Sequence, residues 1–394
     1  MIRTYLDNNA TTRTAPEAVS AMLPYLLEDF GNPASMHAAG VAAARGVARA
    51  RAAVRGLLGA ALDEEIVFTS GGTEANTTAI TSALAADPAR RQIVTSTVEH
   101  PAVLSVCAWL ERTAGAIVHR IGVDSEGRLD IDAYRAALGP ETALVTLMWA
   151  NNETGTIFPI EGLAELAHRA GAIFHTDAVQ AAGKVSLDLA GAGVDMASIS
   201  AHKLHGPKGI GALYLRKGTR FQPLLRGGHQ ERGWRAGTLN VPGIVGFGRA
   251  AELVCGTDRQ QMARLRDRME RGLLERIDGV RVLGDLRDRL PNTSALAFDY
   301  VEGEAILMML DREGIAASSG AACASGAMEP SHVLRAMKVP LAAIHGGLRL
   351  SLSRETTEED VDRVLDLLPG IVTRLRGMSP FGAGAGALMG EGAQ

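Results

Sequence analysis

A lysine follows a short apolar run near the middle of the chain and stands just before a Gly-Pro turn. The run covers residues 196–199 and is followed by Ser200, His202, Lys203 and Gly206-Pro207. An α/β sheet exposes its reactive side chains in polar turns of this kind, at strand ends. A lysine held there can form a Schiff base with an aldehyde cofactor if its neighbours lower its pKa. Taken alone, the pattern also fits a surface lysine in a hairpin.

A second segment has the order strand, Gly-Gly turn and helix start, in residues 68–76. Unpaired backbone N–H groups at a helix start form an anion site, and Gly72 with the Thr73 hydroxyl would make it suitable for a phosphate. The alternative is an ordinary turn between a strand and a helix, with Thr73 as the N-cap.

A third segment ends an apolar run with Asp177 and continues to Gln180. A carboxylate at the end of a buried strand is costly unless it has a cationic partner. A protonated pyridine nitrogen is such a partner, and its protonation makes the ring an electron sink. Gln180 would then donate a hydrogen bond to the phenolic oxygen of that ring. Alternatively, Asp177 caps the next helix and Gln180 is an exposed residue of a helix.

Two further polar groups follow apolar runs: His100 after 92–96, and Asn152 after 143–148. His100 would stack on a cofactor ring, although a core histidine explains it equally well alone. Asn152 would contact substrate or cofactor. Five such segments in one sheet together predict pyridoxal 5'-phosphate. The spacing expected of a dinucleotide or P-loop motif is absent, and His202 and His205 have no carboxylate or Cys nearby for a metal site.

The three cysteines differ in their surroundings. Cys323 stands among small residues in 317–326, which predicts a loop that can swing and expose its thiol. An accessible thiolate suits sulfur transfer, because the thiolate is the attacking species. Cys107 lies in an apolar helical pattern and is predicted to be core, whereas Cys255 has no such context. Near the C-terminus, Arg349 and Arg354 are alternative carboxylate ligands that the pattern does not separate.

Composition excludes several classes of protein. The chain has 394 residues, 46% of them hydrophobic and 21% charged, with a formal net charge of −4. We therefore expect a globular protein without nucleic-acid affinity. No apolar run is long enough to span a bilayer, and the first residues do not resemble a signal peptide. The widely separated cysteines argue against disulfides. These features predict a cytoplasmic protein that does not bind membranes.

Strand-length apolar runs alternate with helical patterns through the first two thirds of the chain. The predicted strands cover 66–69, 92–96, 143–148, 172–175 and 196–199, and helices are predicted at 129–138 and 160–170. This order predicts an α/β fold with a mostly parallel sheet between helices. After about Cys255 we expect helices at 259–276, 304–313 and 358–374, with strands near 281–283 and 295–298. The predicted domains are a large one (13–258), a smaller α+β one (1–12 and 259–380) and a flexible tail (381–394).

The motifs together resemble the cysteine desulfurases, fold-type-I pyridoxal-phosphate enzymes of the class V aminotransferase group. The resemblance covers residues 2 to about 380. Its segments are Tyr5-Leu-Asp-Asn-Asn-Ala-Thr-Thr12, Gly31-Asn-Pro-Ala-Ser-Met-His37, Thr69-Ser-Gly-Gly-Thr-Glu74, Val98-Glu-His-Pro101, Asn151-Asn-Glu-Thr-Gly155, His175-Thr-Asp-Ala-Val-Gln180, Ser200-Ala-His-Lys203, Arg226-Gly-Gly-His-Gln-Glu-Arg232, Arg235-Ala-Gly-Thr238, Ser318-Ser-Gly-Ala-Ala-Cys323 and Leu350-Ser-Leu-Ser-Arg354. Three segments are similar to the nitrogen-fixation (NifS-type) branch: 148–156, 227–233 and 329–333.

The resemblance implies a role for each matched residue. It assigns cofactor binding to Gly72, Thr73, His100, Asn152, Asp177, Gln180, Ser200, His202, Lys203 and Thr238, the last reaching in from the partner subunit of a homodimer. Lys203 would carry the cofactor and His100 would stack on it, both as catalytic residues. Asn152 and Arg354 would bind the substrate carboxylate.

In this family Cys323 would attack the sulfur of L-cysteine, become a persulfide and leave L-alanine. The sulfur would pass to an iron–sulfur scaffold protein, for nitrogenase in the NifS-type branch. No resident metal is expected, and a transient iron–sulfur cluster at Cys323 stays open. Ala321 and Ala324 stand where hydroxyl residues are expected, which puts the hydrogen bonding of the thiol in question. The alternatives are a housekeeping desulfurase, a selenocysteine lyase and a non-enzymatic sulfur carrier or scaffold.

Overall fold

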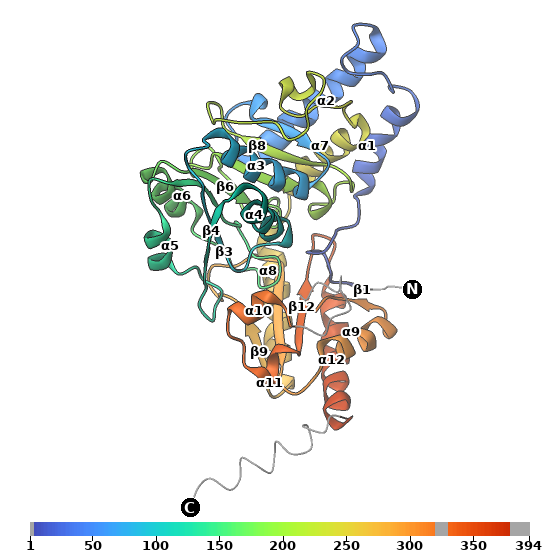
Figure 1. The fold of residues 1–394 in the computed structure, drawn as a ribbon. Coiled ribbons are helices and arrows are strands. Elements are labelled where there is room, and N and C mark those ends of the chain that lie inside the picture. Colours follow the sequence, from blue (N-terminus) through green and yellow to red (C-terminus); the bar gives the residue numbers. More distant parts are fainter. Residues whose placement is uncertain (1–3, 320–329, 379–394) are drawn as a thin grey trace, which may run out of the picture.

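In a computed structural model, which describes residues 4–319 and 330–378, a seven-stranded sheet runs through the larger part of the chain (Figure 1). Its strands, from one edge to the other, are β2 (Ile66–Thr69), β8 (Gly211–Leu215), β7 (Met196–Ser200), β6 (Ile173–Asp177), β5 (Thr142–Thr146), β3 (Gln92–Ser96) and β4 (Ile117–Ile121). All neighbours are parallel except β8, which is antiparallel to both β2 and β7.

Helices cover both faces of this sheet, and alternate strand residues face different cores. In β2, Ile66 and Phe68 join one core, whereas Val67 between them joins the other. The first core is shared with α1 (Pro16–Leu27), α2 (Ala38–Leu58), α5 (Ile131–Ala137), α6 (Ile160–Arg169) and α7 (Val241–Cys255). The second core is shared with α3 (Gly72–Ala86) and α4 (Pro101–Ala114). Burial on both faces explains why these strands read as continuous apolar runs.

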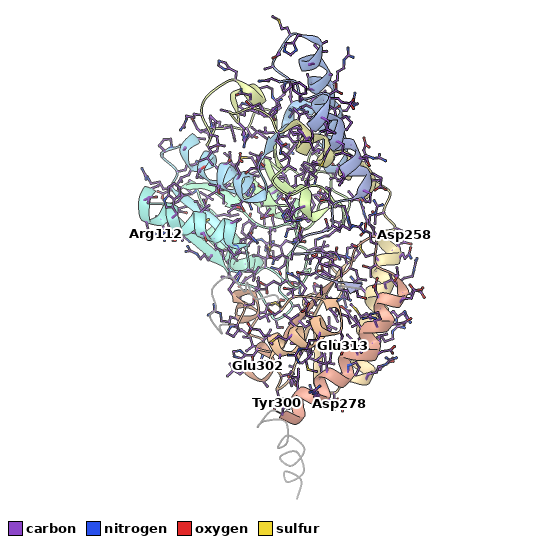
Figure 2. The ribbon with its side chains drawn as sticks, turned by 90° about the vertical axis from the view of Figure 1, so that its right-hand side faces the viewer. Arg112, Asp258, Asp278, Tyr300, Glu302 and Glu313 are labelled. Atoms are coloured by element: carbon purple, nitrogen blue, oxygen red, sulfur yellow. The ribbon has the colours of Figure 1, made fainter. Side chains whose placement is uncertain are left out.

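The later part of the chain forms a smaller antiparallel sheet with its own core. Its strand order is β12 (Gly347–Ser351), β10 (Thr293–Phe298) and β9 (Val280–Leu283). The core here also includes residues of α8 (Arg259–Arg276), α9 (Gly303–Arg312) and α12 (Glu358–Met378). Figure 2 shows α8 running from Asp258, near the larger sheet, toward Asp278 at the far end.

The N-terminal segment connects the two parts. β1 (Thr4–Tyr5) pairs in parallel with β11 (Ile315–Ala316), and the chain then passes from Leu6, in the smaller core, toward the larger sheet. The remaining short elements are α10 (His332–Ala336), α11 (Leu341–Ile344) and the 3-10 helices Asp63–Glu65, Ala201–Lys203 and Gln230–Gly233.

The α/β fold with a mostly parallel sheet, predicted from alternating patterns, is confirmed. The helix predicted at 259–276 is confirmed to the residue, whereas the strand predicted at 143–148 ends at Thr146. The domain boundaries at 12/13, 258/259 and 380/381 remain predictions, and 381–394 lie outside the described residues. Within the described residues, no helix is long and apolar enough to cross a membrane.

Candidate active site

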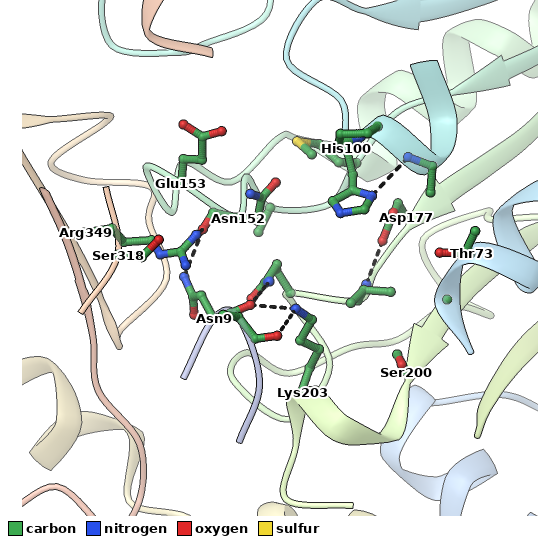
Figure 3. A pocket seen from close by; sticks show the side chains of 18 of the residues that line it. Asn9, Thr73, His100, Asn152, Glu153, Asp177, Ser200, Lys203, Ser318 and Arg349 are labelled. Atoms are coloured by element: carbon green, nitrogen blue, oxygen red, sulfur yellow. Dashed lines mark hydrogen bonds between the residues drawn. The ribbon is translucent and has the colours of Figure 1, made fainter. Parts of the chain in front are cut away.

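A cavity of about 550 Å³ lies where β6, β7 and the starts of α3 and α4 meet (Figure 3). The carboxyl ends of parallel strands meet at one edge of a sheet, and ligands bind there. The cavity brings together nine of the predicted residues: Gly72, Thr73, His100, Asn152, Asp177, Gln180, Ser200, His202 and Lys203. Their proximity is a finding, and their individual roles remain predictions.

Lys203 ends a short 3-10 helix that follows directly on β7. Its Nζ donates hydrogen bonds to the backbone carbonyls of Asn9 and Ala10, both at 2.7 Å. Burial, assisted by the charge of Arg349, lowers the pKa of Lys203 to about 8. A lysine with that pKa supplies a substantial fraction of neutral amine near neutral pH, which nucleophilic attack on an aldehyde requires.

The start of α3 and the end of β7 form the predicted phosphate site. Gly72 is the first residue of α3, and a Cβ there would lie 2.9 Å from Val179 Cγ2 and 3.6 Å from Ser200 Cβ. The absence of that Cβ keeps the backbone N–H groups of the helix start accessible to an anion. His202 Nδ1 is hydrogen bonded to Thr11 Oγ1 at 3.1 Å. Burial, with the Lys203 charge, lowers the pKa of His202 to about 4.

Asp177 is the last residue of β6 and is only 6% exposed. Its Oδ2 accepts a hydrogen bond from Asn76 Nδ2 at 2.7 Å, and its Oδ1 accepts one from the backbone N–H of Val179 at 3.0 Å. Both donors are neutral. The carboxylate therefore lines the cavity without a cationic hydrogen-bond partner among the described residues, although a buried negative charge favours one.

His100 caps α4, because its Nδ1 accepts a hydrogen bond from the backbone N–H of Ala102 at 3.1 Å. Burial lowers the pKa of His100, so the imidazole is neutral at physiological pH. The core-histidine alternative is not met, since the ring lines the cavity near Asp177 (Figure 3). The sequence contains the capping signal as His100-Pro101, with proline at the first helical position.

Arg354 does not line this cavity, and its contact with the substrate carboxylate stays a prediction. It lies in the turn after β12, and its guanidinium is 3.9 Å from the Glu17 carboxylate. Arg349 lies within β12 and lines the cavity instead. One of its terminal nitrogens donates to the Asn152 carbonyl at 3.0 Å and the other to Asp7 Oδ1 at 2.9 Å. Its buried Nε has no hydrogen-bond partner among the described residues.

The structure describes Cys107, Cys255 and Thr238, but not Cys323. Cys323 lies outside the described residues, but Ser318 and Pro330, which stand on either side of the segment that contains it, line the cavity. Cys107 is confirmed as a core residue of α4, and burial raises the pKa of its thiol to about 12. Cys255 is exposed. Thr238 is exposed and does not line the cavity of its own chain.

Several polar residues of the cavity, among them Asn9, Asn76 and Glu153, were missed by the sequence patterns. Asn9 comes from the N-terminal segment, Asn76 lies one turn into α3, and Glu153 follows Asn152. Glu153 accepts a hydrogen bond from the Ser331 hydroxyl, and burial raises the pKa of its carboxyl to about 7. The signal for Asn76 was available, because positions 72, 73 and 76 share one helix face. No periodic pattern marks Asn9.

The aminotransferase class-V family model matches residues 4–364 of the chain. The chain belongs to this family. Among class-V aminotransferase relatives, a cysteine desulfurase of Cereibacter sphaeroides is 68% identical over 97% of this chain and 99% of its own length. The cysteine desulfurase NifS of Azotobacter vinelandii is 54% identical over 98% and 96%. A solved NifS-like protein superposes with a TM-score of 0.88 at 37% identity, covering 95% of this chain and all of its own. Within the family, the chain therefore belongs to the cysteine desulfurases.

Class-V aminotransferases imply pyridoxal phosphate as the cofactor, and the described residues fit it. Among the described residues, the hydrogen-bond donors to the buried Asp177 carboxylate are neutral, so it suits a protonated pyridine nitrogen. Lys203 supplies an amine with a lowered pKa at the same cavity. The helix start at Gly72, where a Cβ would meet Val179, suits the phosphate.

Proposed function

We propose that the chain is a pyridoxal-phosphate-dependent L-cysteine desulfurase in which the sulfur moves from L-cysteine to Cys323. The observation that carries this proposal is the pairing of a buried carboxylate, Asp177, with an amine of lowered pKa, Lys203, in one cavity. Relatives named cysteine desulfurase, at 54% to 68% identity over nearly the whole chain, support the same activity.

When bound, pyridoxal phosphate supplies an electron-accepting ring that makes bonds at the substrate's α-carbon easier to break. Lys203 would hold it covalently, Asp177 would hold its ring nitrogen protonated, and His100 would lie against its ring. The phosphate would bind at Gly72 and Thr73 with Ser200 and His202.

Arg349 is the residue that we propose for the substrate carboxylate, together with Asn152. Its guanidinium lines the cavity and is already oriented by two hydrogen bonds, to Asn152 O and Asp7 Oδ1. A planar guanidinium with further N–H donors recognises a carboxylate through parallel hydrogen bonds. This assignment replaces Arg354, which is directed toward Glu17.

The Cys323 thiolate attacks the substrate sulfur and forms a persulfide, while the carbon–sulfur bond of L-cysteine breaks. The carbon that loses sulfur gains a proton, so L-cysteine and the Cys323 thiol give L-alanine and the Cys323 persulfide. The positions of Ser318 and Pro330 at the cavity support this role. The persulfide would pass its sulfur to an iron–sulfur scaffold protein. The 54% identity to a NifS supports a nitrogenase role for that cluster assembly.

The test compares Cys323→Ala with Cys255→Ala, which changes an exposed cysteine. Each protein is incubated with L-cysteine and a reductant, and L-alanine and sulfide are measured. The unsubstituted chain and Cys255→Ala should produce both in equal amounts. Cys323→Ala should bind pyridoxal phosphate, seen by its visible absorption, yet form neither product. Unchanged sulfide release from Cys323→Ala would exclude the proposed nucleophile.

A further inference from the structure

Lys184 is buried behind the cavity rather than in its lining. The residue is 7% exposed, and its Nζ donates hydrogen bonds to two side-chain amide oxygens, Asn9 Oδ1 at 2.9 Å and Gln180 Oε1. Amide oxygens are weaker partners for a cation than a carboxylate, so burial lowers the pKa of Lys184 well below its usual value. A buried amine of this kind is costly, and the reaction described above gives it no role.

Neighbouring backbone carbonyls identify which atom of each amide is the nitrogen and which is the oxygen. Gln180 Nε2 donates to the backbone carbonyl of Asn9 at 2.9 Å, and Asn9 Nδ2 donates to the backbone carbonyl of Asn152 at 3.1 Å. A backbone carbonyl only accepts, so the atom that faces it must be the amide nitrogen in each case. Both amide oxygens must therefore face Lys184, whose amine has the N–H groups to satisfy them.

Gln180 is the link from Lys184 to the cavity, because Gln180 lines the cavity and Lys184 does not. The Gln180 amide nitrogen uses one N–H for Asn9 and keeps a second, for which no other acceptor is found among the described residues. We propose that Lys184 is a positioning residue: by holding Gln180 Oε1, it keeps the Gln180 amide nitrogen on the cavity side, as a hydrogen-bond donor to the phenolic oxygen of bound pyridoxal phosphate. This inference rests on the proposed function, since it needs the cofactor.

Removal of the Lys184 amine would leave Gln180 Oε1 buried without its donor. The amide would then keep its hydrogen bond to the Asn9 carbonyl but lose the contact that fixes its oxygen end, so its second N–H group would be held less firmly toward the cavity. One hydrogen bond of this kind corresponds to about a three- to tenfold change in an equilibrium constant. A residue with a purely structural role would alter the stability of the protein without altering the cofactor's absorption.

The experiment is a double-mutant cycle of Lys184→Met and Gln180→Ala, measured on protein freed of cofactor and then titrated with pyridoxal phosphate. Two quantities are read: the Kd of the cofactor, and the pH midpoint of its visible absorption change. The matched control is Lys217→Met, a lysine whose side chain is 69% exposed on the surface. Urea unfolding of each cofactor-free protein reports stability separately.

We expect Lys184→Met and Gln180→Ala each to weaken cofactor binding about three- to tenfold, and to raise the pH midpoint. The double variant should match Gln180→Ala alone, because Lys184 acts through Gln180. Additive effects, or an unchanged Kd and midpoint in Lys184→Met, would overturn the proposal. If Lys184→Met does not fold, Lys184→Gln enters the same cycle under the same criterion. Failure of the unsubstituted protein to bind pyridoxal phosphate would instead contradict the proposed function.

Discussion

The pKa of the Lys203 amine, and with it the reactivity of the amine, depends on effects that act in opposite directions. Burial and the Arg349 charge disfavour its protonated form, while Asp177 and Asp7 favour that form, and the balance lowers the pKa to about 8. The neutral fraction of an amine increases as pH rises toward its pKa. At pH 7 this lysine is therefore roughly a tenth neutral, whereas a lysine in water is less than a thousandth neutral.

We predict that the cofactor-free protein combines with pyridoxal phosphate at a rate that rises with pH, has its midpoint near pH 8 and levels off above it. The rise reflects loss of the proton from Lys203, so the rate below the midpoint should fall about tenfold per pH unit. Stopped-flow absorption measures it, and a free lysine derivative in the same buffers corrects for ionisation of the cofactor itself. A midpoint near the ordinary lysine pKa would contradict the lowered value.

Arg349 and Arg354 are the two alternative ligands for the substrate carboxylate, and the same substitution at each position compares them. We predict that Arg349→Lys, which keeps the charge and the contact region of Asp7 but loses the planar fork, raises the KM for L-cysteine about ten- to hundredfold. Arg354→Lys should leave the KM unchanged, because Arg354 lies outside the cavity. Steady-state kinetics of L-alanine formation test both, and the opposite pattern would restore Arg354 as the ligand.

The start of α3 is the element on which phosphate binding depends. We predict that Gly72→Ala weakens pyridoxal phosphate binding about tenfold, because its Cβ would lie 2.9 Å from Val179 Cγ2. Gly162→Ala in α6 is the control, since a Cβ there meets nothing within 4 Å. It should keep the cofactor affinity and increase helix stability by about 0.5–1 kcal/mol. Absorption titration measures the affinity. If the unsubstituted protein, Gly72→Ala and Gly162→Ala all bind pyridoxal phosphate equally well, the phosphate does not bind at Gly72.

Strand ends were the part of the site that the sequence could predict. Asp177 and Ser200 end parallel strands, and His100 and Gly72 stand just beyond two other strands, so sheet geometry alone brings them to one edge. The antiparallel direction of β8 follows from the short turn after Lys203, which leaves no room for a crossover helix.

The sequence around Arg349 contains an alternating pattern that could have distinguished it from Arg354. Leu348 and Leu350 of β12, and Leu352 directly after it, belong to the smaller core. The period of two therefore places Arg349 on the opposite face of the strand. Family resemblance alone favoured Arg354, which follows the strand. Asn9 had no comparable signal, because its position depends on the pairing of β1 with β11, which are more than 300 residues apart in the chain.

At the scale of the whole molecule, we propose a homodimer in which Thr238 acts at the partner's site. Thr238 is exposed and absent from the cavity of its own chain, which supports this assignment. We predict that a mixture of Lys203→Ala and Thr238→Ala subunits regains activity. Each mixed dimer would contain one unmodified site and one site with both changes, so random pairing restores about a quarter of the sites. A fully active monomer at assay concentration, shown by sedimentation, would exclude shared sites.

The position of Asn9 has a consequence for biosynthesis. Its backbone N–H donates to the Ser351 hydroxyl at 2.9 Å, across 342 residues of sequence, and its carbonyl accepts from Lys203. A ribosome synthesises Asn9 first and Ser351 only 342 residues later. We therefore expect the segment that contacts Lys203 to reach its final place only after Ser351 has been synthesised. We expect chains that already include Ser351, rather than shorter nascent ones, to be competent to capture pyridoxal phosphate.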